Sequence, residues 1–425
     1  MNLLILVVCF LAFMVMGMPI AFNLIGSTFI YALFSGMDPM VIASNLYGGM
    51  DSFSFLAVPF FVLTGQFMLQ GHLLESLIDL VNAFFGRMKG ALAIVTIGVS
   101  LLMGSIVGLA VAAAASLGVF LIPMMKKEGY GADYSAAVMA SASLLGPIMP
   151  PSVLMILYCI SAGSTSITGV FLAAVIPAVM IAAVQMVIAH RVAKKENYKA
   201  YRKYTAREKW TALKKAIPAL LLPVIILGGI FSGIFSITEA SAVAAVYSGI
   251  LAFFVKRSVR LKDVPKLFRD VAATSGLVLL LAAAGTVMSW AIANERVLDL
   301  VIRPLSALPA PVFLLMVNVL LLIVGCFMDD YASVAILAPI LGPVAWAVGV
   351  HPIHFAVVFC VNLVIGLATP PFGITLFVTS PIAGVSIERT VRKAIPFIVA
   401  TIAVLLLITF VPDVVLFLPR LLNYA

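Results

Sequence analysis

The chain has 425 residues, of which 64% are apolar and only 10% are charged, and its formal net charge is +9. A soluble domain is typically about 45–50% apolar and about 25% charged. So much apolar surface cannot be hidden in one globular core, which excludes a soluble enzyme, a disordered chain, a nucleic-acid-binding protein and a secreted disulfide scaffold. Apolar runs of about 18 or more residues recur along the chain, which predicts an all-α integral membrane protein rather than a membrane β-barrel.

The first 36 residues are apolar and are interrupted once, at 17–19. They predict either one long bent helix or two shorter helices. A cleavable signal sequence is not expected, because no basic region precedes the apolar run.

The next informative region is 87–127, which has basic residues at both ends, namely Arg87 and Lys89 before it and Lys126 and Lys127 after it. Basic loops between apolar spans mark the cytoplasmic side. The residues between these ends are too few for two crossings, which need about 40 residues and a turn. We therefore predict a re-entrant hairpin that enters from the cytoplasm, with one long kinked span as the alternative.

Two basic segments in the middle of the chain set the remaining topology. Residues 191–215 hold ten of the 26 basic side chains, and 256–269 hold six more. If both basic segments are cytoplasmic, the chain crosses outward through 216–232 and returns through 236–255. It crosses outward again through 271–294, and a last span at about 394–418 also runs outward. The count is nine full spans and two hairpins, with the N-terminus inside and the C-terminus outside.

An internal repeat is visible in the pattern G-x-x-x-P-P, which occurs at 146–151 and again at 366–371, an offset of 220 residues. Pro123 and Pro343 each lie 27 residues before the first proline of the equivalent pair. Several matches at nearly constant offset predict a duplicated half.

The charges fix the relative orientation of the two halves. The closing helix of the first half ends in a basic run, whereas its counterpart begins after one, and the second hairpin has no basic edge. This predicts inverted-topology repeats, which many secondary transporters have. The expected units are a first repeat over 1–190 with hairpin 87–127 and broken helix 131–160, a basic loop and linking helix over 191–233, and a second repeat over 234–425 with hairpin 309–348 and broken helix 353–379.

A Pro-Pro pair inside a membrane span removes backbone hydrogen bonds, so the carbonyls that it frees must face protein or a watery cavity. Such carbonyls and half-helix ends suit a small hard cation. The alternative for each motif alone is a plain proline kink. The predicted Na⁺ ligands come from the two hairpin tips and the two breaks, and are Ser105, Gly146, Met149, Ser152, Gly325, Asp329, Gly366 and Thr369. Neighbouring residues are predicted to meet the substrate, namely Gly104, Pro151, Asp330, Pro371 and Gly373.

The acidic pair Asp329-Asp330 has two interpretations. Acids inside a membrane are functional candidates, but an aspartate at a hairpin tip also caps a helix. His351 and His354 are expected to lie in a solvated outer loop. No Lys or Arg lies between Lys127 and Arg191, so a carboxylate substrate would depend on helix N-termini, hydroxyl groups and co-bound cations.

An ordered set of motifs resembles the large membrane subunit of the TRAP (tripartite ATP-independent periplasmic) transporters over essentially the whole chain. The motifs are G-M-P-I-A-F at 17–22, P-x-F-V-L-x-G at 59–65, G-P-I-M-P-P-S at 146–152, T-E-A-x-A-V-A-A-V-Y at 238–247, G-x-F-M-D at 325–329 and A-T-P-P-F-G at 368–373.

This resemblance implies an elevator-type fold in the bacterial inner membrane, and Na⁺ sites where a hairpin tip meets a broken helix. It also implies two partners, a small four-helix membrane subunit and a periplasmic substrate-binding protein, and import of a carboxylate such as a C4-dicarboxylate, sialic acid or another sugar acid. The chain is then not an enzyme, and an uncoupled, channel-like permease is the alternative function. Which carboxylate is carried stays open.

Overall fold

The computed structural model describes every residue except 1, 72, 164, 199–203, 296–307 and 425, and the side chains of 104–107 also lie outside the described part. Every regular element that it describes is a helix. Nine described helices are long and apolar enough to cross a membrane, or up to ten if the bent pair Ala132–Ile148 and Val153–Ala162 forms one span. The predicted all-α membrane protein is confirmed. The nine are not the nine crossings predicted from sequence, because they include three arms of the hairpins.

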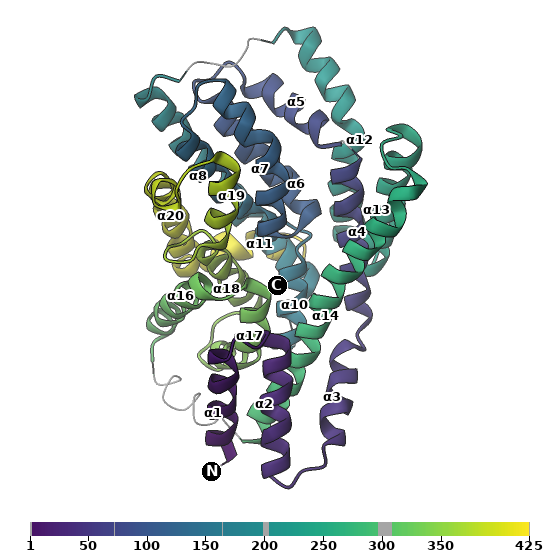
Figure 1. The fold of residues 1–425 in the computed structure, drawn as a ribbon, viewed down its shortest axis with the longest axis vertical. Coiled ribbons are helices and arrows are strands. Elements are labelled where there is room, and N and C mark those ends of the chain that lie inside the picture. The colour runs from purple at the N-terminus through teal and green to yellow at the C-terminus, as the bar shows by residue number, and fades with distance from the viewer. Residues whose placement is uncertain (1, 72, 164, 199–203, 296–307, 425) are drawn as a thin grey trace.

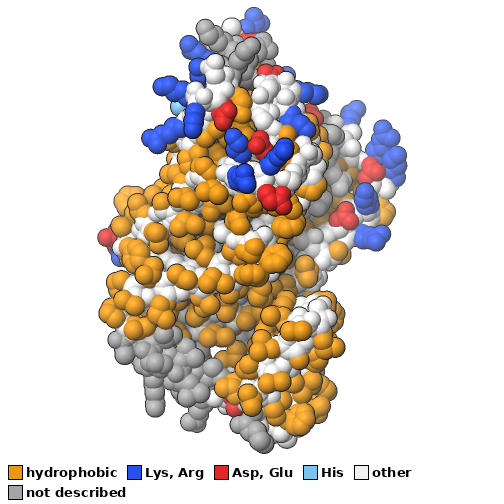
Figure 2. Space-filling view, turned by 60° about the vertical axis from the view of Figure 1, so that its left-hand side comes forward, with side chains coloured by type: hydrophobic (Ala, Val, Ile, Leu, Met, Phe, Trp, Pro, Cys, Tyr) orange, Lys and Arg blue, Asp and Glu red, His pale blue; other side chains and the backbone are white. Residues whose placement is uncertain are grey.

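The N-terminal segment forms two helices, α1 (Asn2–Val15) and α2 (Ile20–Phe34), which pack against each other. The chain reverses at Gly17, whose φ of +75° is a conformation that favours glycine. Each helix is only about 21–23 Å long, too short for a hydrocarbon core of about 30 Å. The predicted cytoplasmic N-terminus is wrong, because α1 begins at the lower end of the molecule in Figure 1, whereas Figure 2 shows the Lys and Arg side chains gathered at the upper end. The sequence interpretation assumed that this apolar run crosses the membrane.

A second group of helices forms the right-hand side of Figure 1. Its members are α3 (Met40–Met50), η1 (Phe53–Leu56), α4 (Ala57–Gln70), α12 (Ala206–Phe231), α13 (Ile237–Ile250), η2 (Leu251–Val255), η3 (Leu261–Asp263) and α14 (Val264–Asn294). Helix α4 packs along α13, and α14 packs against α2, α3 and α4. We call α1–α4 and α12–α14 the scaffold.

The remaining helices form a bundle beside the scaffold, and amphipathic α5 (Leu73–Phe85), which packs on α12, leads the chain into it. The bundle contains two helix pairs, two interrupted helices, two long helices and a short last helix. They are α6 (Ala91–Val107) with α7 (Ala110–Lys127), α16 (Ala310–Phe327) with α17 (Asp330–Ala347), α8 (Ala132–Ser143) and α9 (Leu145–Ile148) with α10 (Val153–Ala162), α18 (Pro352–Gly366) with α19 (Ile374–Ala383), α11 (Ile167–Lys195), α20 (Ile387–Phe410) and α21 (Pro412–Leu421).

Each helix pair of the bundle packs against the interrupted helix of the other half as well as against its own. The second arm of the first pair, α7, packs on α19, and the second arm of the second pair, α17, packs on α10. Each interrupted helix therefore touches both helix pairs. The interiors of α8, α10 and α18 are almost wholly buried, so the first interruption lies inside protein and not in lipid.

Most of the Lys and Arg side chains that the structure describes gather at one end of the molecule. Figure 2 shows Lys and Arg side chains gathered over its upper part, above a broad hydrophobic surface. They come from the ends of α7 and α11, the start of α12, the segment before α14 and the first turns of α20. By the positive-inside rule this end faces the cytoplasm.

Candidate functional site

The first helix pair meets the first interrupted helix at Gly108. Helix α6 ends at Val107, and Gly108 (φ +66°) turns the chain into α7. A Cβ on Gly108 would lie 3.7 Å from Val153 Cγ2, so the turn rests on the first residue of α10. The predicted Na⁺ ligand Ser105 and the predicted substrate contact Gly104 fall within 104–107, of which the structure describes only the backbone.

The first break runs through extended backbone from Met149 to Ser152. Ser152 is fully buried, and its hydroxyl donates to the carbonyl O of Pro147 at 2.5 Å and accepts from the backbone N of Met155 at 3.3 Å. The Ser152 side chain thus bonds to a carbonyl of α9 and caps the N-terminus of α10. Of the other predicted residues here, Gly146 and Pro151 are buried and Met149 is half-buried.

The second helix pair crosses the second interrupted helix at two glycines. A Cβ on Gly366 would lie 2.5 Å from the carbonyl C of Gly325, and a Cβ on Gly325 would lie 2.9 Å from the carbonyl O of Leu363. Any larger side chain would push the two backbones apart. The structure therefore brings together Gly325 and Gly366, as predicted, and Thr369 follows one turn later with its hydroxyl donating to the carbonyl O of Ile365 at 2.8 Å.

The two breaks differ in exposure. Both contain a cis bond between the two prolines, at Pro150-Pro151 and at Pro370-Pro371. The first pair is buried, whereas Pro370, Pro371 and Phe372 are exposed and Gly373 is buried. Phe372 lies beside Phe327 of the hairpin, with ring centroids 5.4 Å apart. The second break is thus open on one side, where the first is enclosed.

The acidic pair occupies the start of α17. Asp329 is the N-cap residue, and its carboxylate accepts from the backbone N of Tyr331 at 3.2 Å. The carboxylate of Asp330 accepts from the same N at 3.1 Å, and Asp330 is only 3% exposed. The capping interpretation is therefore correct for Asp329. Its remaining oxygen lone pairs and those of Asp330 are still suited to a hard cation.

A contact between the two halves was not predicted. The hydroxyl of Tyr331 donates to the carbonyl O of Gly108 at 3.3 Å, and both residues are buried. Tyr331 directly follows the acidic pair, and Gly108 is the turn of the other hairpin. The start of α17 and the first hairpin turn therefore meet, so the regions predicted to hold the two cation sites lie next to each other.

A buried polar network also escaped sequence analysis. Asn362 Nδ2 donates to Asn318 Oδ1 at 2.7 Å, and Asn318 Nδ2 donates to Thr409 Oγ1 at 3.0 Å, which joins α16, α18 and α20. Asn318 precedes Gly325 by seven residues and Asn362 precedes Gly366 by four. Those helical spacings put each amide on the same face as its glycine, a signal that could have revealed the network.

The expectation of two histidines in a solvated loop is wrong for His354. It lies inside α18, is 1% exposed, and donates from Nε2 to the carbonyl O of Ile408 at 2.8 Å. His351 is half-buried ahead of α18. The prediction failed because the end of α20 covers this part of the chain.

Comparison with known proteins identifies the family. The family model described as "Tripartite ATP-independent periplasmic transporter, DctM component" matches residues 7–414. The chain belongs to this TRAP transporter family. It is a transport permease and not an enzyme, and a multi-pass protein of the bacterial inner membrane.

Relatives of this TRAP permease include the C4-dicarboxylate TRAP transporter large permease protein of Pseudomonas aeruginosa, which is 36% identical over 92% of each chain. The sialic acid TRAP transporter large permease protein of Vibrio cholerae is 36% identical over 95% of each chain. The crystal structure of the YdaH transporter of Alcanivorax borkumensis superimposes with a TM-score of 0.63 and 15% identity, covering 87% of this chain and 86% of that one. The last match shows a shared fold.

Proposed function

We propose that the chain is the large membrane subunit of a Na⁺-coupled importer of a small carboxylate. The observation that carries the proposal is the meeting of the two interrupted helices and two hairpins, joined by the Tyr331–Gly108 hydrogen bond. Freed carbonyls, hydroxyls and the Asp329-Asp330 carboxylates supply the oxygen ligands that a hard cation needs. The two relatives above are named for a C4-dicarboxylate and for sialic acid, and both substrates are carboxylates.

We further propose that the two halves are inverted repeats and that the bundle moves as a unit against the scaffold. Figure 1 shows α1, α2 and α3 at the lower end of the molecule, whereas α16 and α18 lie near mid-height. This offset of α16 and α18 toward the basic end supports an inward-facing arrangement of an elevator. Small residues at the contact between α14 and α17 support sliding, because Gly285 approaches Ala335 so closely that a Cβ would lie 2.9 Å from its carbonyl O.

The proposed partners are a small membrane subunit and a periplasmic binding protein that delivers the substrate. The word "tripartite" in the family description supports this assembly. The scaffold offers a matching surface, since many large apolar side chains of its helices are exposed, among them Phe29, Leu33, Val224 and Val246. Exposed apolar side chains of this kind suit lipid or a second membrane protein.

The test is uptake of radiolabelled succinate and sialic acid into proteoliposomes that contain the complete membrane complex, with the binding protein added outside. We expect accumulation only with an inward Na⁺ gradient and only with the binding protein. Equal uptake without the gradient would contradict coupling and would favour an uncoupled permease.

A further inference from the structure

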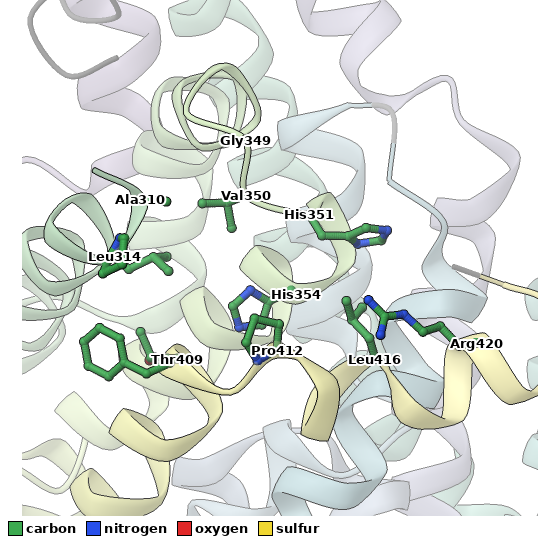
Figure 3. A pocket seen from close by; sticks show the side chains of 12 residues that line it. Ala310, Leu314, Gly349, Val350, His351, His354, Thr409, Pro412, Leu416 and Arg420 are labelled. Carbon is green, nitrogen blue, oxygen red and sulfur yellow. The ribbon is translucent and has the colours of Figure 1, made fainter. Parts of the chain in front are cut away.

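A cavity of about 270 Å³ lies at the end of the bundle that faces away from the basic residues. Helix α20 carries Lys393 near its cytoplasmic start, and Phe410 at its other end is about 26 Å away. The cavity lies beside Phe410, between the start of α16, the connection ahead of α18, and α21 (Figure 3). We call it the outer cavity, because it lies at the end of α20 opposite the basic start of that helix.

The walls of this outer cavity are mostly apolar. Leu314 and Pro311 line it from α16, and Pro412 and Leu416 line it from α21. Ligand pockets for whole small molecules usually measure about 300–1,000 Å³, so this one suits part of a longer molecule. A chain segment fits such walls better than a sugar acid, whose hydroxyl groups would lose their hydrogen bonds there.

Positive charge lies at one side of the same cavity. Arg420 lines it and is half-exposed, and its guanidinium forms an ion pair with exposed Asp413 at 2.6 Å. Exposed pairs of this kind are weak, and a guanidinium has five donors, so Arg420 can still bind another anion. Figure 3 shows the His351 ring beside the Arg420 side chain. Among the described residues His351 Nδ1 has no hydrogen-bond partner, although it is buried.

Arg420 supplies the positive charge near neutral pH. Burial, and secondarily the charge of Arg420, lowers the pKa of His351, which favours the neutral ring. His354 also lines the cavity, but it already donates to the carbonyl O of Ile408. Arg420 is the only Lys or Arg that the described residues contribute to the cavity wall.

The surroundings of the cavity are those of a membrane-facing surface. Large apolar side chains are exposed on both sides of it, on α16 and on the α20–α21 corner. They are Val312, Leu315, Met316, Phe410, Val411 and Phe417. An apolar pocket that opens beside such side chains and has a cation at its rim matches a lipid, with its chain in the pocket and its headgroup at the cationic rim.

We propose that this outer cavity binds one anionic phospholipid, with an acyl chain between α16 and α21 and its phosphate on Arg420. The proposal goes beyond coupled transport and does not depend on Na⁺ sites. A lipid there would contact the first arm of the second hairpin and the last helix together.

The test is native mass spectrometry of the permease after reconstitution with equal amounts of phosphatidylglycerol and phosphatidylcholine that carry the same acyl chains. We expect wild-type protein to retain phosphatidylglycerol about fivefold better, as one basic group near a membrane surface allows. Arg420→Gln should abolish that preference, whereas Arg389→Gln, at the cytoplasmic end of α20, should keep it. Asp413→Asn should strengthen it by about twofold to fivefold, because it removes the competing carboxylate.

A second pair of variants tests the chain-binding part of the cavity. Ala310→Trp fills the cavity and should lower retention of both lipids, whereas Val312→Trp, on an exposed face of the same helix, should not. No preference in the wild type, or equal effects of Arg420→Gln and Arg389→Gln, would overturn the proposal. Displacement of the lipid by millimolar inorganic phosphate would also overturn it, in favour of a site for free anions.

Discussion

Loss of the Tyr331 hydroxyl should uncouple the two proposed Na⁺ sites. The phenol donates to the carbonyl O of Gly108 at 3.3 Å, and the backbone N of Tyr331 donates to both carboxylates of the acidic pair. A cation that orders the acidic pair therefore also positions the first hairpin turn. Tyr331→Phe removes one buried hydrogen bond, worth about 1 kcal/mol, and keeps the ring. If that bond carries the coupling, the second Na⁺ should bind about fivefold more weakly.

The assay is a Na⁺ titration of succinate uptake in proteoliposomes. For Tyr331→Phe we expect a higher half-saturating Na⁺ concentration and a Hill coefficient that falls toward one, with normal expression. Tyr158→Phe is the matched control, because Tyr158 is equally buried and its hydroxyl has no hydrogen-bond partner among the described residues. An unchanged titration curve for Tyr331→Phe, or the same shift in both variants, would refute the coupling argument.

Two further predictions rest on close contacts at glycines, and a third concerns the hydroxyl of Thr369. Gly285→Val should stop uptake without loss of expression, because its side chain would clash with α17. Gly276→Val in the same helix should be tolerated, because no atom lies near its Cβ position. Equal uptake by the two variants would contradict a sliding contact. Gly366→Ala should lower the free energy of unfolding by about 1–3 kcal/mol, because α16 and α18 must move apart to make room for the methyl group. Gly228→Ala is the control and should have no such effect, because no atom lies near its Cβ position. Thermal melting in detergent compares the two variants. Thr369→Ala should weaken Na⁺-dependent uptake more than it lowers expression, and equal loss of both would instead indicate a folding role.

The interruptions were predictable from sequence because proline acts on the local backbone. A Pro-Pro pair in an apolar run predicts a break wherever it lies. This signal needs no knowledge of distant residues, whereas the meeting of Gly325 with Gly366 was expected only from the family resemblance. The capping role of Asp329 is equally local, since a carboxylate at a helix start accepts from the first free N–H groups.

Long-range contacts were not predictable in the same way. Tyr331 and Gly108 are 223 residues apart, and no local pattern pairs them. His354 is buried because the end of α20 covers it, and a single sequence carries no signal for that contact. The N-terminal topology failed for a different reason. The apolar run at the N-terminus was interpreted as a helix that crosses the membrane. In the structure α1 and α2 are each too short to cross the hydrocarbon core, and they pack against each other.

Helix α14 connects the two parts of the molecule through neighbouring residues that face different partners. Thr286 lies against Gly49 of α3, where a Cβ would come within 2.7 Å of its hydroxyl, and Gly285 lies against Ala335 of α17. Successive residues of a helix are about 100° apart, so one short stretch of α14 touches scaffold and bundle at once. The contact of α14 with α3 is made by the side chain of Thr286 packed on Gly49, whereas its contact with α17 is between the small residues Gly285 and Ala335. If the bundle moves, α14 therefore stays with α3 and the bundle slides along its glycine face.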